Sequence, residues 1–158
     1  MHTPPTYRCN LGAIGWNHDA WSGPFYPDDL PPEWRLAFYN TEFECTYLPY
    51  LVWSRETPET LAQWRNETQE RFRFLLEPPH GENAPEDAAR LAALGEQAVV
   101  ASTPEDPKIL WLEPDANLKH LAQSIQEQAL TSPLYLISVG ADYPQLEKTR
   151  TLLEILGY

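Results

Sequence analysis

Acidic side chains lie at or near the ends of several apolar runs in this sequence, and their positions suit catalysis. Glu44 lies inside one apolar run, Glu77 and Glu113 follow two others, and Asp142 follows the last. In α/β folds, ligands bind at the C-terminal ends of the strands. Two carboxylates there could act as acid and as nucleophile or base, as in glycosidases, and three could hold a divalent cation. The catalytic candidates are therefore Glu44, Glu77 and Glu113.

A structural interpretation competes with this one, because acids that follow strands commonly cap the next helix. Asp115 and Asp142 stand where such caps belong, and a chain with 23 acidic residues places some of them near strand ends by chance. Glu44 is the strongest catalytic candidate because it lies within an apolar run rather than after it.

Other catalytic signatures are absent from the sequence. It contains no P-loop, no G-x-G-x-x-G, no H-E-x-x-H and no G-x-S-x-G motif, and its four histidines lack metal-ligand spacing. The sequence therefore predicts no resident cofactor and no dedicated metal site, with a divalent metal at the acids as the alternative.

An aromatic segment, residues 15–34, combines tryptophans with prolines and glycines. Flat rings could form a stacking platform for a sugar or a base. Alternatively they plug the end of a sheet, which we favour because prolines rigidify a loop and aromatic side chains at this density need burial. The ligand-binding candidates on the predicted strand-end face are Trp16, His18, Trp21, Tyr26, Tyr47 and Tyr50.

Apolar runs alternate with amphipathic stretches along the chain, which is typical of repeated βα units. Residues 97–102 and 109–112 could instead pair as a hairpin around the turn TPEDP. The pattern predicts one α/β domain over residues 1–158, with strands at 7–14, 42–47, 72–76, 97–102, 109–112 and 134–139 and helices at 31–39, 58–71, 84–94, 116–130 and 143–156.

Composition narrows the class of protein. The 158 residues carry 11 basic and 23 acidic side chains, which gives a net charge of −12. Nucleic-acid binding depends on clustered Lys and Arg that neutralise phosphates, so it is not expected here. The N-terminal residues resemble no secretory signal, and no apolar run reaches membrane-helix length. Cys9 and Cys45 are expected to be reduced and buried. We predict a cytoplasmic protein without nucleic-acid or membrane partners.

Several motifs resemble those of the YecE-like family, domain of unknown function 72. They cover about the first 80 residues. Glu44 takes the place of the glutamate in that family's E-I-N-x-x-F-Y motif, and Leu110-Trp111 is a weaker echo of its L-F-Q-L-P strand. The other matching stretches are Gly15-Trp16, Trp21-x-Gly23-Pro24-Phe25-Tyr26-Pro27, Leu30-Pro31-Pro32, Thr57-Pro58-Glu59-Thr60 with Trp64, and Phe72-Arg73-Phe74.

The resemblance implies a TIM-barrel-like α/β fold, whereas a barrel of eight βα units usually takes about 250 residues. The sequence supplies about six strands, which predicts a truncated, open or incomplete barrel. Either a smaller α/β layer forms, or an open barrel closes its exposed edge against a second copy in a homodimer.

Departures from the family pattern fall mainly on polar positions. The family's G-T-S-G reads Gly12-Ala13-Ile14-Gly15, the tyrosine of G-W-x-Y is His18, and the lysine of V-K-A-P is Glu77. A site built on an acid and a base does not normally survive such losses. We therefore predict a divergent member that binds a small ligand or a protein partner at the strand C-terminal face. The alternative is a hydrolase that uses Glu44 with Glu77 or Glu113.

Overall fold

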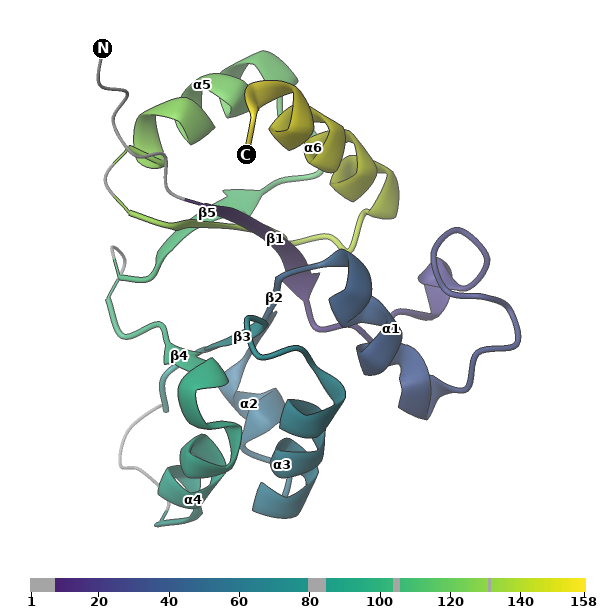
Figure 1. Ribbon diagram of the computed structural model, residues 1–158, viewed down its shortest axis with the longest axis vertical. Coiled ribbons are helices and arrows are strands. Elements are labelled where there is room, and N and C mark those ends of the chain that lie inside the picture. The colour runs from purple at the N-terminus through teal and green to yellow at the C-terminus, as the bar shows by residue number, and fades with distance from the viewer. Residues whose placement is uncertain (1–7, 80–84, 104–105, 131) are drawn as a thin grey trace.

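A computed structural model describes residues 8–79, 85–103, 106–130 and 132–158 of the chain. Strands and helices alternate along most of it, with three short 3-10 turns (Figure 1). The elements in chain order are β1 (Cys9–Ile14), η1 (Asp19–Trp21), η2 (Pro32–Trp34), α1 (Arg35–Glu42), β2 (Cys45–Leu48), α2 (Tyr50–Trp53), α3 (Pro58–Glu67), β3 (Arg73–Leu76), α4 (Pro85–Leu94), η3 (Gly95–Gln97), β4 (Ala98–Val100), β5 (Lys108–Leu112), α5 (Leu118–Gln128), β6 (Leu134–Ser138) and α6 (Tyr143–Leu156).

The six strands of the described chain form one sheet in the order β4-β3-β2-β1-β6-β5, and every pairing is parallel. The first strand, β1, lies at the centre, between β2 and β6, as in a barrel where the first and last strands meet. The sheet curls into an open half-barrel, so the predicted α/β, TIM-barrel-like but incomplete fold is confirmed.

One ring contact shows how far the sheet curls. Tyr47 of β2 and Trp111 of β5 have ring centroids 5.0 Å apart, although β1 and β6 lie between their strands. In a flat sheet these strands would be about 14 Å apart, at roughly 4.8 Å per strand. Their side chains meet because the inner face is concave.

The alternative that residues 97–102 and 109–112 pair as a hairpin does not hold. These runs contain β4 and β5, which lie at opposite edges of the sheet and each pair in parallel with another strand. Seven residues, 101–107, join them and can span at most about 25 Å. The two edges of a flat six-stranded sheet would be about 24 Å apart, so this connection suffices to leave β4 and β5 as the open edges of the half-barrel.

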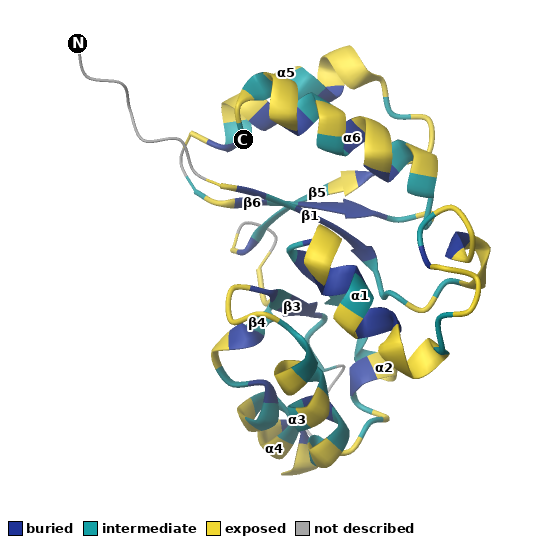
Figure 2. Ribbon diagram, turned by 45° about the vertical axis from the view of Figure 1, so that its right-hand side comes forward, coloured by how far each residue is buried: buried dark blue, intermediate teal, exposed yellow. Residues whose placement is uncertain are grey.

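The sheet has an outer core and an inner core, because successive side chains of a strand point to opposite faces. The outer face packs under the helices, and Figure 2 shows β1 buried along most of its length. The inner face has its own cluster, in which Cys45, Leu75 and Ile137 are fully buried. Cys45 and Cys9 are both buried free thiols, as expected.

Helix boundaries follow local capping chemistry. Thr57 accepts a hydrogen bond from the Thr60 amide, and Asp142 accepts one from the Gln145 amide, as the cap role predicted for Asp142 requires. The predicted cap Asp115 is wrong: Asn117 caps α5 and accepts from the amides of residues 119 and 120. The sequence also predicts Asn83 as the cap of the helix at 84–94, and this residue lies outside the described residues.

Helix α2 was not predicted, because four residues carry too little periodicity to detect. No helix in the described ranges is both long and apolar enough to cross a membrane.

Candidate functional site

The C-terminal end of the sheet carries the aromatic pair Tyr47 and Trp111. Tyr47 is the third residue of β2, and Trp111 is the penultimate residue of β5. Their rings meet edge to face, yet Trp111 remains 41% exposed. Burial and the nearby Glu77 carboxylate raise the pKa of Tyr47, so its hydroxyl stays protonated at neutral pH. This end therefore presents two adjoining rings and a nearby carboxylate.

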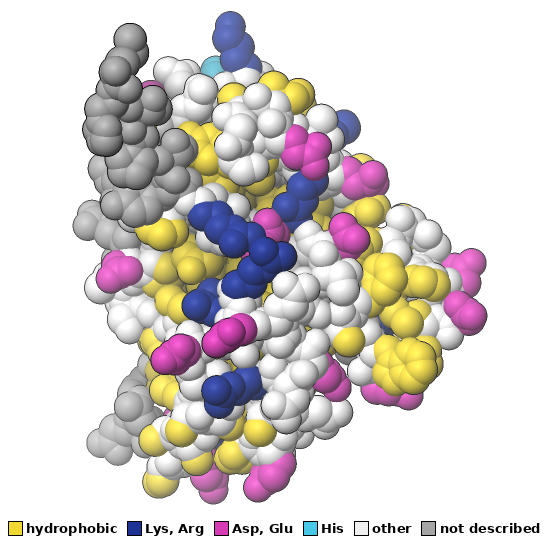
Figure 3. Space-filling view, viewed as in Figure 1, with side chains coloured by type: hydrophobic (Ala, Val, Ile, Leu, Met, Phe, Trp, Pro, Cys, Tyr) yellow, Lys and Arg dark blue, Asp and Glu magenta, His cyan; other side chains and the backbone are white. Residues whose placement is uncertain are grey.

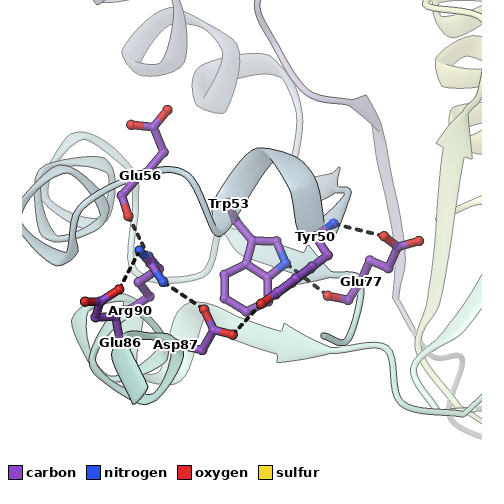
Figure 4. A network of polar contacts seen from close by, with 7 residues as sticks. All are labelled: Tyr50, Trp53, Glu56, Glu77, Glu86, Asp87 and Arg90. Carbon is purple, nitrogen blue, oxygen red and sulfur yellow. Dashed lines mark hydrogen bonds and ion pairs between the residues drawn. The ribbon is translucent and has the colours of Figure 1, made fainter. Parts of the chain in front are cut away.

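Glu77 follows β3 at the same end and binds the start of α2. Its Oε1 accepts a hydrogen bond of 3.0 Å from the Tyr50 amide, and its backbone carbonyl accepts one of 3.0 Å from the Trp53 indole (Figure 4). These contacts fix the short helix that follows β2. They also hold the Glu77 carboxylate in one position next to Tyr47.

Tyr50 links this end to α4. Its hydroxyl donates to Asp87 Oδ2 at 2.7 Å, and Asp87 Oδ1 pairs with Arg90 at 2.8 Å (Figure 4). The hydrogen bond to Asp87 is the main reason that the pKa of Tyr50 is raised. Asp87 is 1% exposed, and Arg90 also donates to the Glu56 carbonyl at 2.6 Å. This buried network holds α2 and α4 together.

Glu113 follows β5, so it belongs to the same end of the sheet as Glu77. Its side chain is exposed, and its backbone carbonyl accepts a hydrogen bond from the Gln145 amide group of α6. Glu113 is thus an exposed carboxylate two residues beyond Trp111.

Glu44 lies at the opposite end of the sheet, because β2 begins at Cys45 and not at residue 42 as predicted. The backbone amide of Arg73 donates to the Glu44 carbonyl, and the backbone amide of Glu77 donates to the Leu48 carbonyl. Glu44 and Glu77 are therefore separated by four residues of strand, about 13 Å. The two carboxylates of a glycosidase lie roughly 5 to 9.5 Å apart. The structure does not bring the predicted pair, Glu44 and Glu77, that close together.

The Glu44 carboxylate is engaged in a bidentate ion pair with Arg150 of α6. Its two oxygens lie 2.9 and 3.1 Å from the guanidinium, and Arg150 also donates to the Glu42 carbonyl. This geometry ties α6 to the start of β2. The simplest role for Glu44 is structural.

The aromatic segment after β1 plugs the outer core rather than forming an open platform. Trp21 is 1% exposed, Tyr26 is fully buried, and the Trp21 indole donates to the Ala141 carbonyl at 2.9 Å. Tyr26 donates to the Trp16 carbonyl. Neither Trp21 nor Tyr26 has a ring face open to a ligand, which agrees with the favoured interpretation.

Trp16 and His18 are only partly buried. The Trp16 ring packs edge to face on Trp64, with centroids 4.8 Å apart. The His18 ring lies 4.5 Å from that of Trp21, and its Nε2 donates to the Gly15 carbonyl at 3.2 Å. Burial lowers the pKa of His18, so the ring is neutral at neutral pH. Both side chains complete the plug from its rim.

The sequence did not predict Trp111 as a site residue, nor the Asp87–Arg90 pair. The weak Leu110-Trp111 motif is the one signal that pointed to Trp111. Among the described residues, no three His, Cys, Asp or Glu side chains come together to hold a metal ion.

Comparison with known proteins supports the same picture. The family model "Protein of unknown function DUF72" matches residues 10–81, which confirms the resemblance found in the motifs. A DUF72 family protein of Thermotoga maritima superposes with a TM-score of 0.58 at 12% identity, over 92% of this chain and 99% of that one. A DUF72 family protein of Enterococcus faecalis gives 0.60 at 8% identity, over 96% and 98%. No curated protein matches the chain.

Proposed function

We propose that this chain, a divergent member of the DUF72 (YecE-like) family, is a binding module that recognises its ligand at the C-terminal end of the sheet. One observation carries the proposal: Trp111 is 41% exposed beside Tyr47, at the end where α/β folds hold their ligands. An exposed tryptophan supported by a second ring is a typical hot spot of recognition.

The occupant that fits this pair presents a flat apolar face, such as a sugar ring or an apolar side chain of a protein partner. Leu51 and Val52 of α2, which follows β2 at the same end, are 60% and 43% exposed and extend the apolar character. Glu77 and Glu113 supply acceptors for hydroxyl or amide groups. Glu113 is engaged through its backbone carbonyl, which accepts from Gln145, whereas Glu77 Oε1 already accepts from the Tyr50 amide and would accept from a ligand in addition.

A thermal-shift screen against sugars, nucleotides and organic acids tests the proposal. A ligand at 100 times its Kd adds about 2.7 kcal/mol to the free energy of unfolding, which is easily visible. Trp111→Ala should reduce the stabilisation by the same ligand concentration to about 0.9 kcal/mol, because loss of a hot-spot tryptophan costs about 2 kcal/mol of binding, roughly 30-fold in Kd. Trp34→Ala is the matched control, since Trp34 is 61% exposed and touches no other described ring.

A shift that survives undiminished in both Trp111→Ala and Tyr47→Leu contradicts this site. If no small molecule gives a shift, the ligand under the proposal is a protein. Binding of a candidate protein partner must then weaken in Trp111→Ala and persist in Trp34→Ala.

A second candidate is self-association across the open wall. Strands β4 and β5 each have a neighbour on one side only, and Val99 and Ile109 of the inner core are only partly buried there. Unpaired strand edges readily pair with another chain, so a second copy could close the barrel. Light scattering at micromolar concentration tests this: a dimer that Ile109→Lys dissociates supports it, and a monomer refutes it.

A further inference from the structure

A hollow of about 450 Å³ lies on the outside of the barrel, between α1 and α6, away from the inner face that carries Tyr47 and Trp111. Its volume is in the range that small-molecule sites occupy. Figure 3 shows a carboxylate side chain between these two helices, with hydrophobic side chains beside it. The lining residues are Phe25, Phe38, Glu42, Phe43, Tyr143, Leu146, Glu147, Arg150 and Thr151.

Four aromatic rings form the apolar wall of this hollow, with Phe25 at their centre. The centroid of Phe25 lies 5.0 Å from that of Phe38, 5.4 Å from Phe43 and 5.3 Å from Tyr143. Aromatic faces carry negative potential and attract cations within about 6 Å. The chain already shows this on Phe43, where the Arg150 guanidinium lies 5.6 Å from the ring centroid.

Two carboxylates flank the rings. Neither Glu42 nor Glu147 pairs through its carboxylate with any residue in the part of the chain that the structure describes, and both side chains are exposed. Both line the hollow together with Tyr143, whose pKa is raised by burial and by the charges of Glu147 and Glu42.

The cation on the rim, Arg150, attracts the charge of Glu42 but forms its ion pair with Glu44. Its bidentate pair with Glu44 already compensates its charge, at 2.9 and 3.1 Å. The hollow therefore joins four rings to two carboxylates that form no ion pair within the described residues, on a chain whose net charge is −12.

We propose that this hollow binds a small organic cation of the alkylammonium type, seated on the rings of Phe25 and Tyr143 between Glu42 and Glu147. The rings attract the positive charge and exclude water from one side, and the carboxylates attract it from the other. An anion is disfavoured by Glu42 and Glu147, and a neutral apolar molecule leaves their charges unused.

The test titrates the full chain with choline by calorimetry, next to 3,3-dimethylbutan-1-ol, which has the same shape without the charge. Choline should bind about tenfold more tightly than the alcohol, the effect of a partly desolvated cation–π contact. The double variant Glu42→Gln/Glu147→Gln should weaken choline binding by about tenfold. Glu127→Gln, an exposed glutamate of α5, is the matched control and should bind choline normally.

Three outcomes overturn the inference. Equal affinity for choline and the alcohol would mean an apolar hollow without charge recognition. Absence of saturable choline binding would mean that the site does not form. Choline binding that is unchanged in the double variant, or lost in Trp111→Ala, would place the cation elsewhere. Melting curves of each variant establish that the fold is intact, so a loss of binding is not mistaken for unfolding.

Discussion

Two groups of aromatic side chains in this molecule differ in what surrounds them. The segment after β1 places Trp21 and Tyr26 in the outer core, where the structure leaves them at most 1% exposed. The pair at the C-terminal end of the sheet meets across the concave inner face and leaves Trp111 41% exposed. Both groups include tryptophan and tyrosine, so residue type alone does not distinguish them.

The difference teaches where recognition should be sought. A buried ring that donates its N–H to a backbone carbonyl, as Trp21 does to Ala141, is satisfied by the protein itself. A partly exposed ring at a strand end keeps contact area that a ligand can bury. The first group therefore supports the fold, and the second is the group that we propose to bind a ligand.

The largest expected effect tests the buried group. Trp21→Ala removes a side chain that packs on Phe25, Tyr39 and Phe43, and it leaves the Ala141 carbonyl without its donor. We expect a loss of about 3–5 kcal/mol in the free energy of unfolding. Urea denaturation measures it; a loss below about 1 kcal/mol would show that the segment is not a plug.

A smaller effect is expected at the N-terminal end of the sheet. Glu44→Gln breaks the bidentate pair with Arg150, which is partly exposed, so we expect a loss of about 1–2 kcal/mol in stability. Binding at the Tyr47–Trp111 end should not change. Ligand binding that is lost while the melting temperature stays constant would instead make Glu44 a functional residue.

The exposed group should behave oppositely to the buried one. Trp111→Ala should change the free energy of unfolding by about 1 kcal/mol or less, because much of the ring is in water. The same change should weaken ligand binding roughly 30-fold. A Trp111→Ala protein as unstable as Trp21→Ala would erase the distinction between the two groups.

The smallest effect is a pH dependence at the rim of the buried group. Burial lowers the folded-state pKa of His18 below 6.5, so the unfolded chain binds more protons as the pH falls through that value. Acidification from pH 7.5 to pH 5.5 should therefore destabilise the wild type more than His18→Gln. Calorimetric melting temperatures at both pH values test this, and equal losses in the two proteins would contradict it.

Much of the fold could be predicted from the sequence, because periodicity and caps are local. Helix α6 begins at Tyr143 and ends at Leu156 as predicted, and Gly157 stops it with a left-handed φ of 87°. The edge positions of β4 and β5 could not be predicted in this way. Their partners β3 and β6 are set by the curl of the whole sheet, whereas two short apolar runs around a proline turn resemble a hairpin.

The candidate site was predicted less well, for related reasons. A shift of three residues in the start of β2 moved Glu44 from inside the strand to its N-terminal end. The contact between Tyr47 and Trp111 exists because strands that are not neighbours face each other across the curled sheet. The position at a strand end was enough to predict Tyr47 and Glu77 as site residues, but it did not predict Trp111, which contacts Tyr47.

The position of β1 between β2 and β6 also sets the order in which the chain can fold. The Asn10 side chain donates to the Leu134 carbonyl, 124 residues away, whereas β2 follows β1 closely. Strands β1 to β4 can pair as they leave the ribosome, but one edge of β1 waits until almost the whole chain has been synthesised. Long-range parallel pairing of this kind is slow. During translation the edge of β1 at the centre of the finished sheet thus stays open until β6 has been made.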